Sequence, residues 1–167
     1  TVDTANNTNV KYINAKKRTT KVVIYGNEKV DSIYGGTKAD TIYAGINGAT
    51  IDGAAGNDRI YGVISDTTKF VSVNGGKGND VFIYASGDGN DVITDYQTGD
   101  VIKITSGSVS SAAISGNDYV FTVGSGKITV KDAKDKYIAV ADANDNITWY
   151  PESPIISATY SSGQVTL

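Results

Sequence analysis

Two residue types that often carry protein chemistry are missing from this chain of 167 residues, which has no cysteine and no histidine. Without cysteine there are no disulfides, thiolate zinc sites or cysteine nucleophiles. Without histidine the commonest general base and transition-metal ligand is gone. The remaining metal ligands are oxygen atoms, from 16 aspartates and from backbone carbonyls. Such donors suit a hard cation such as Ca²⁺.

Long apolar segments are absent too. No apolar run reaches the roughly 20 residues of a membrane-spanning helix, so we expect no transmembrane segment. The chain does not begin with Met and has no signal-peptide pattern, so we expect a fragment or a processed product. Its length suits one domain, or a repetitive domain with an attached cap.

What the chain does contain is an apolar residue at every ninth position. Five isoleucines follow this spacing: Ile24, Ile33, Ile42, Ile51 and Ile60. A helix repeats its apolar positions about every 3.6 residues and a strand about every two, so a period of nine requires another unit. A six-residue turn followed by a three-residue strand fits. Four such units fill residues 26–61, and GGKGNDVFI at 75–83 is a further one.

These units resemble the nonapeptide G-G-x-G-x-D-x-U-x of the RTX family, in which U is a large apolar residue. GGKGNDVFI matches every fixed position of that motif. The segment GDGNDVITDYQTGDVIKI at 87–104 is similar to the one that closes RTX repeats before a final β region. The resemblance implies an all-β fold: a right-handed parallel β-roll or solenoid that binds Ca²⁺ in its turns, with an antiparallel β cap at its C-terminal end.

We expect three parts along the chain. Residues 1–25 form an N-terminal strand and cap, residues 26–104 the β-roll, and residues 105–167 a cap of β-hairpins with a tail. The inward series continues through Val73, Phe82, Ile93 and Ile102. From Ser106 the pattern changes to strands joined by short Gly, Asn and Asp turns, which is typical of hairpins. The tail is either an edge strand or a C-terminal export signal.

The turns of such a roll fall on two edges. Successive units alternate between two facing sheets, so neighbouring turns on one edge lie two repeats apart. The first edge carries an unbroken series of aspartates: Asp40, Asp58, Asp80 and Asp100. On the second edge the series is interrupted, in the order Asp31, Ala49, an inserted loop ending near Val71, and Asp91. We therefore expect calcium to be concentrated on the first edge.

The resemblance implies that two neighbouring turns share each ion, because Ca²⁺ takes about six to eight oxygens and one turn cannot supply them. The best-formed set is Ala54, Gly56 and Asp58 with Gly75, Lys77 and Asp80. A second set is Gly36, Lys38 and Asp40 with Gly53, Ala55 and Asp58. A third joins Gly76, Gly78 and Asp80 to the turn 95–100, with Asp100 and Asp95 as carboxylates. Asp91 ends a well-formed turn on the second edge, where Asp66 of the inserted loop is a candidate partner. The alternative for every aspartate is a turn cap that hydrogen-bonds backbone N–H groups without a metal.

The family resemblance also implies a role outside the cell. RTX domains are exported unfolded by type I secretion machinery and fold when they meet Ca²⁺, since binding energy is then folding energy. We expect a secreted, non-catalytic domain that stabilises a larger extracellular protein. Whether that protein carries a catalytic domain upstream stays open.

Two surface features allow other partners. Tyr25, Tyr43 and Tyr61 point outward from one sheet, either as a stacking platform for a polysaccharide or cell-surface glycan or as a surface on which the C-terminal hairpins pack. A basic cluster at 11–21 suits nucleic acid or acidic polysaccharide, or is a solvated edge. We favour the edge and expect no nucleic-acid partner, because Tyr12 is its one aromatic residue. Parallel β-helices also host polysaccharide lyases and epimerases, but no catalytic set of Asp, Lys, Arg and Tyr can be assembled here.

Overall fold

The computed structural model describes residues 1–4, 7, 9–45, 49–62, 71–151, 159–161 and 164–166. Within these ranges every regular element is a strand, and no segment forms a helix of the length and apolarity that crossing a bilayer requires. The expectation that Asp66 partners Asp91 falls outside the described residues. In the tail, β17 (Thr159–Ser161) and β18 (Gln164–Thr166) form an antiparallel pair.

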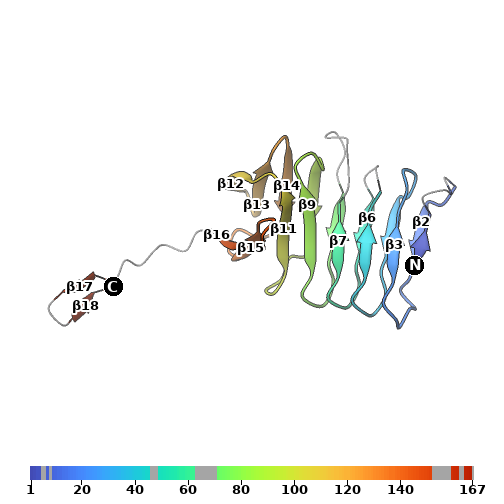
Figure 1. Ribbon diagram of the computed structural model, residues 1–167, viewed down its shortest axis with the longest axis horizontal. Coiled ribbons are helices and arrows are strands. Elements are labelled where there is room, and N and C mark those ends of the chain that lie inside the picture. Colours follow the sequence, from blue (N-terminus) through green and yellow to red (C-terminus); the bar gives the residue numbers. More distant parts are fainter. Residues whose placement is uncertain are drawn as a thin grey trace.

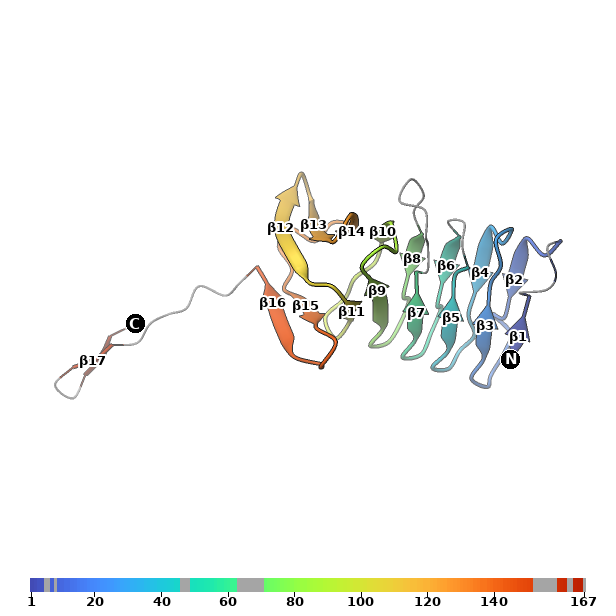
Figure 2. The same ribbon diagram turned by 45° about the horizontal axis from the view of Figure 1, so that its top comes forward.

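Two eight-stranded sheets form the body of the molecule (Figure 1, Figure 2). Sheet A contains, in spatial order, β1 (Val2–Asp3), β3 (Val23–Tyr25), β5 (Thr41–Tyr43), β7 (Arg59–Tyr61), β9 (Val81–Ala85), β11 (Val101–Ser106), β15 (Ile138–Ala141) and β16 (Ile147–Tyr150). Sheet B contains β12 (Val109–Ser115), β13 (Asp118–Val123), β14 (Gly126–Val130), β10 (Asn90–Ile93), β8 (Ser72–Asn74), β6 (Thr50–Asp52), β4 (Ser32–Tyr34) and β2 (Tyr12–Asn14).

Successive strands from β2 to β11 alternate between the two sheets, and neighbours within each sheet run parallel. This is the arrangement that a nine-residue period predicts, because two units make one full coil. The middle residue of each short strand points inward, since side chains alternate along a strand. The expected parallel β-solenoid is confirmed.

The isoleucines form two stacked rows in the core between the sheets. Ile24, Ile42 and Ile60 are register partners in sheet A, and Ile33 and Ile51 are partners in sheet B. All five are at most 1% exposed. The rows continue through buried residues, as expected: Val73, Phe82, Ile93 and Ile102. Burying each such side chain contributes about 1.5 to 3 kcal/mol to the free energy of folding. The two rows together are therefore the main apolar support of the roll.

Parallel stacking continues beyond the last recognisable repeat. β14 pairs parallel with β10, and β15 pairs parallel with β11, which adds one more coil to the solenoid. The antiparallel strands are β12 and β13, inserted before this coil, and β16, added after it. The hairpin pattern from Ser106 predicts these strands but not the parallel coil, because residues 126–141 have inward apolar residues without the G-G-x-G-x-D spacing of the repeat.

Shortening a core isoleucine tests the apolar row. Ile60→Ala should lower the free energy of unfolding by about 2 to 5 kcal/mol, because it removes buried methyl groups and leaves a cavity. Ile114→Ala is the control, since Ile114 is 54% exposed, and it should change stability by less than about 0.5 kcal/mol. Denaturant unfolding in calcium measures both, and equal losses would contradict the assignment of the core.

Candidate metal centre

One edge of the roll is built by the turns that lead from sheet B to sheet A. They lie at residues 35–40, 53–58, 75–80 and 94–100. The aspartate that ends each turn is register-aligned with the next, and all four side chains are at most 2% exposed: Asp40, Asp58, Asp80 and Asp100. The structure therefore brings together the series that the two-repeat spacing predicts. Four carboxylates in one buried row are costly unless each has partners.

Backbone amides of the preceding turn supply the first set of partners. The Oδ1 atom of each aspartate accepts a hydrogen bond from the N–H one coil earlier: Asp40 from Val22 at 2.8 Å, Asp58 from Asp40 at 2.7 Å, Asp80 from Asp58 at 2.8 Å, and Asp100 from Asp80 at 2.9 Å. We call these four contacts the carboxylate ladder. Such charge-assisted bonds are about twice as strong as neutral ones. The amide donors could have been found from the spacing, because register places each amide beside the next carboxylate.

Apolar residues bound the ladder at both ends. Val22 is the register neighbour of Asp40, and Ile138 is the register neighbour of Asp100. Both are buried, at 3% and 0% exposure. The ladder therefore begins and ends where the row of inward positions becomes aliphatic.

The second carboxylate oxygens divide the four aspartates into two classes. Asp40 Oδ2 accepts the N–H of Gly36 at 2.6 Å, and Asp100 Oδ2 accepts the N–H of Gln97 at 2.8 Å. The Oδ2 atoms of Asp58 and Asp80 are buried and have no hydrogen-bond partner. An unpaired buried charged oxygen costs more than the roughly 1 to 3 kcal/mol of a neutral group. A cation bound to either of these two oxygen atoms would remove that free-energy cost.

Carbonyl oxygens of the two neighbouring turns point into the space between them. A Cβ atom at Gly76 would collide with the carbonyl oxygen of Ala54, and one at Gly78 with that of Gly56. From the other side, the carbonyl of Lys77 accepts the N–H of Gly56 at 2.8 Å. The backbone requires glycine here for a second reason, because Gly78 has φ of 139°.

Gly53, the first glycine of its turn, leaves room for two convergent oxygens. A Cβ atom at Gly53 would lie 2.5 Å from both Asp58 Oδ2 and the carbonyl oxygen of Gly75. Of the four carbonyls expected in the best-formed set, that of Gly75 thus lies beside the unpaired carboxylate oxygen, and that of Gly56 lies against Gly78 of the next turn. The carbonyls of Ala54 and Lys77 accept the N–H groups of Lys77 and Gly56, at 3.0 and 2.8 Å. Ca²⁺ prefers such a mixture of carboxylate and carbonyl oxygens, so these residues fit the ion.

The carbonyls of the second expected set make the same kinds of contact as those of the first. The carbonyl of Gly36 accepts the N–H of Ala55 at 3.3 Å, and a Cβ at Gly56 would lie 2.6 Å from the carbonyl oxygen of Lys38. Lys38 is not among the described non-glycine residues with positive φ, whereas Gly56 at the same place in the next turn has φ of 128°. This turn therefore follows a different path, as expected from the lysine.

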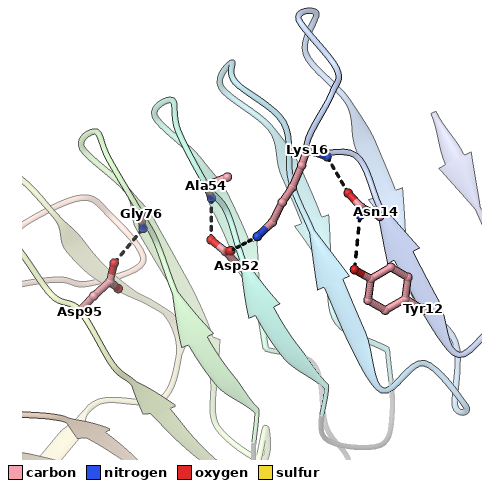
Figure 3. A network of polar contacts seen from close by, with 7 residues as sticks. All are labelled: Tyr12, Asn14, Lys16, Asp52, Ala54, Gly76 and Asp95. Atoms are coloured by element: carbon pink, nitrogen blue, oxygen red, sulfur yellow. Dashed lines mark hydrogen bonds and ion pairs between the residues drawn. The ribbon is translucent and has the colours of Figure 1, made fainter.

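The third expected set has most of its oxygens already engaged. Asp95 accepts the N–H groups of Gly75 and Gly76 with its two oxygens, both at 2.8 Å. Figure 3 shows the bond from Gly76. The carbonyl of Gly76 accepts the side-chain amide of Gln97 at 2.7 Å. Asp95 therefore holds the turn 75–80 as a backbone cap. No signal in the motif distinguishes this capping role from metal binding.

A polar network on the outer face of sheet B lies beside the same turns. Lys16 pairs with Asp52 at 3.0 Å and lies 4.1 Å from the centre of the Tyr34 ring. Asp52 also accepts the N–H of Ala54 at 3.1 Å, and Asn14 donates to the Tyr12 hydroxyl at 3.3 Å (Figure 3). One lysine of the basic cluster at 11–21 is thus used within the fold.

The second edge has a much weaker series. Asp91 is buried and accepts the N–H of Val71 at 3.3 Å, the one rung of ladder type among the described residues of this edge. Asp31 is exposed, and Val30 beside it points inward instead. Ala49 and Val71 fill the two positions between them. The interruption expected from the spacing is present in the register.

Burial changes the protonation of the ladder. Burial, together with the charges of Asp80 and Asp40, raises the pKa of Asp58 to about 7. Burial and the charges of Asp100 and Asp95 raise the pKa of Asp80 to about 6. Burial likewise raises the pKa of Asp91 to about 8. Without metal, Asp58 on the first edge and Asp91 on the second are therefore partly protonated near neutral pH, and a cation that binds Asp58 must displace its proton.

No group of three or more acidic side chains converges on one point within the described part of the chain. Two carboxylates from neighbouring turns are the most that one gap receives. Backbone carbonyls must therefore provide the remaining ligands, which requires the glycine-rich turns described above.

The outward tyrosines form a stacked row on sheet A. Tyr25 and Tyr43 have ring centroids 4.7 Å apart with planes inclined by 7°, and Tyr43 and Tyr61 are 4.3 Å apart and inclined by 20°. The rings face one another and turn their edges to the outside, which does not suit face-on stacking of sugars. Among the described residues, β15 and β16 lie at the far end of sheet A from β3 and β5, so they do not pair beside this row.

Comparison with known protein families gives one match. Residues 25–47 and 48–62 match the family model described as RTX calcium-binding nonapeptide repeat (4 copies). The match includes the turns of Asp40 and Asp58 but not the repeat at 75–83. No curated protein matches the chain.

The metal-free roll should be more stable at pH 5 than at pH 8. Asp58 and Asp80 have folded pKa values of about 7 and 6 against an unfolded value of 3.8, so their stabilisation is complete below pH 3.8 and is lost as pH rises through 6 to 7. The chain has no histidine to titrate in this range. Saturating Ca²⁺ should reverse the trend, because it binds the ionised form. Thermal unfolding followed by circular dichroism measures both, and a metal-free midpoint that rises from pH 5 to pH 8 would contradict the burial of these groups.

Gly53→Ala should weaken calcium binding, because the added methyl group would lie 2.5 Å from Asp58 Oδ2 and from the Gly75 carbonyl oxygen. We expect at least about a tenfold loss of affinity. Gly87→Ala is the control, because a Cβ at Gly87 meets nothing within 4 Å although its φ of 102° makes the change strained. Calorimetric titration with Ca²⁺ compares the two, and an unchanged affinity in Gly53→Ala is the contrary result.

Proposed function

The repeat region of this chain belongs to the family of RTX calcium-binding nonapeptide repeats, and from this premise we propose that the chain is a non-catalytic Ca²⁺-binding β-roll. It folds on binding calcium after export by a type I secretion system, and it stabilises a larger extracellular protein. One observation carries the proposal. The two buried carboxylate oxygens without partners, on Asp58 and Asp80, lie on neighbouring turns of one edge.

Between these two turns, Asp58 and Asp80 with the carbonyls of Ala54, Gly56, Gly75 and Lys77 would hold one ion. Bound calcium supplies positive charge that offsets the repulsion within the buried row. The chain's own residues supply the rest: glycines keep side chains out of the gap, and the carboxylate ladder orients each aspartate. We propose the second set, with Asp40, and the third, with Asp100, as weaker sites, because their carboxylate oxygens already have amide partners.

Folding should depend on metal because the metal-free roll has a high free energy. The chain has 19 glycines, which lose more conformational entropy on ordering than other residues. Its ladder also concentrates like charges, so binding energy is needed for folding. Extracellular calcium modules bind at about 10⁻⁴ to 10⁻³ M. Such a site would be empty inside a cell and filled outside, which agrees with export of an unfolded chain.

Part of the roll should persist without metal. At the C-terminal end, Tyr96 donates to the Asp100 carbonyl at 2.7 Å and accepts the Ala139 amide at 2.8 Å. Asp95 caps the turn 75–80, as described above. We propose that packing and these contacts hold this end at neutral pH, whereas the coils around Asp40 and Asp58 need either calcium or, without it, a pH low enough to protonate Asp58. The proposal keeps the division into residues 1–25, 26–104 and 105–167.

A carbohydrate- or surface-binding module is the alternative from another functional class. The stacked tyrosines do not favour it, because they expose ring edges. An enzyme is also not favoured, because the buried aspartates are engaged in the ladder and Lys16 is paired with Asp52.

Removing both unpaired carboxylates tests the proposed function. Asp58→Asn with Asp80→Asn should reduce calcium affinity by at least about a hundredfold and abolish calcium-induced β signal. Asp31→Asn is the matched control, since Asp31 ends an equivalent turn on the other edge but is exposed. Calorimetry and circular dichroism measure ion number and folding together. Normal calcium-coupled folding of the double variant, or equal loss in the control, would rule out this site.

A further inference from the structure

The four outer edges of the two sheets are not protected equally. An exposed edge strand presents unpaired backbone groups, and proteins guard such edges with short strands, lysines or register irregularities. β1 has two residues, and β2 has three and is preceded by Lys11. β12 has an irregular register between Val109 and Ser111. β16 has four residues, with neither a lysine nor an irregular register.

β16 is an uncharged strand of sequence Ile-Thr-Trp-Tyr that pairs with β15 in unbroken register. No other described strand pairs with its outer side. Ile147 and Trp149 are each 51% exposed and lie on the same face of the strand. The strand therefore combines a free edge with the largest exposed apolar side chains near it.

The backbone N–H and C=O groups of Ile147 and Trp149 are directed toward the free edge. The amide of Asp142 donates to the carbonyl of Asn146 at 3.0 Å, which makes these two a hydrogen-bonded pair. Because such pairs alternate along an antiparallel ladder, Val140 pairs with Thr148 in the same way. The N–H and C=O groups of Ile147 and Trp149 then point away from β15. Four backbone groups lie ready on the outer edge.

We propose that β16 is a self-association edge, and that a second copy of this chain pairs with it in antiparallel orientation about a two-fold axis. With Thr148 opposite Thr148 of the second copy, Ile147 lies opposite Trp149 in both directions. All four outward groups of each copy are then paired at once. An aliphatic residue opposite an aromatic one, and threonine opposite threonine, are favourable cross-strand pairs. Identical strands satisfy these conditions only in the two-fold arrangement.

Two further observations favour a second copy over an unrelated strand. β16 carries no charge, so self-pairing places no like charges opposite one another. The space between the sheets is also open behind it, as a cavity of about 200 Å³ lined by residues that include Ile104, Val140, Thr148 and Tyr150. The second copy would cover this opening, because Thr148 lies at the centre of the contact.

The contact is small, so association should be weak. Four-residue strands bury far less than the roughly 800 Å² per partner of a standard interface. We expect a dissociation constant in the range of about 10⁻⁵ to 10⁻³ M. A two-fold edge contact also closes on itself, so the product is a dimer rather than a fibre.

The sole tryptophan of the chain, Trp149, reports on the contact directly. The full chain in calcium is examined by sedimentation equilibrium and by fluorescence from about 1 μM to 1 mM. The average mass should rise above 17.5 kDa toward twice that value, with a blue shift of the emission. Ile147→Lys should weaken association at least about tenfold. Ile114→Lys, which changes an equally exposed isoleucine on β12, should associate like the wild type.

Several outcomes would overturn the proposal. They are a monomer at 1 mM, a dimer that persists in Ile147→Lys, and a dimer lost in Ile114→Lys. A blue emission that does not depend on concentration would show that another part of the chain covers the edge. If Ile147→Lys loses its β signal in circular dichroism, the variant has not folded and cannot test the contact. Amide hydrogen exchange of the wild-type chain then tests the proposal instead. The Ile147 and Trp149 amides should become protected as concentration rises, and protection that is constant contradicts a second copy.

Discussion

Each buried carboxylate on the first edge accepts the backbone amide of the residue one coil earlier, and the rest of the roll depends on this contact. It fixes the register of consecutive coils, because the amide and the carboxylate must meet within 2.7 to 2.9 Å. It also determines which carboxylate oxygen, Oδ2, has no partner from the ladder. Each ladder contact uses Oδ1, and the local turn decides whether a second amide reaches Oδ2.

The differences between the four turns follow from this limit. Gly36 and Gln97 bring an amide to Asp40 and Asp100, so those carboxylates are complete within the protein. Asp58 and Asp80 lack such a donor and remain half satisfied. Four aspartates that are equivalent in the sequence motif are therefore inequivalent as ligands. The apolar stack supports all four turns equally, and the polar edge distinguishes between them.

The period of the isoleucines predicted a repeating unit of turn and strand, and the resemblance to RTX repeats added the solenoid, the alternation of sheets and hence the row of aspartates. These predictions succeed because one unit of backbone geometry repeats with little variation. Where the motif fades, prediction weakens for physical reasons. The coil formed by β14 and β15 is held by inward aliphatic residues such as Ile128 and Ile138, which any buried strand could contain. The capping role of Asp95 depends on where two glycine amides point. The stacking of the tyrosines on one another is likewise a matter of side-chain orientation that spacing does not determine.

The alternation of strands between two sheets limits which changes of length the roll can accept. A deletion or insertion of nine residues would transfer every later strand to the opposite sheet and move the aspartates to the other edge. Eighteen residues, a complete coil, is the smallest change of repeat number that keeps each aspartate above its predecessor. Extra residues within a turn do not change the order of the strands. Thr50 pairs with Ser72, so the coil between them is longer than eighteen residues, and the later strands still alternate between the two sheets. Duplication of whole coils is thus the natural way for such a chain to grow, and variation within a turn is the natural way for one edge to lose its metal ligands while the other retains them.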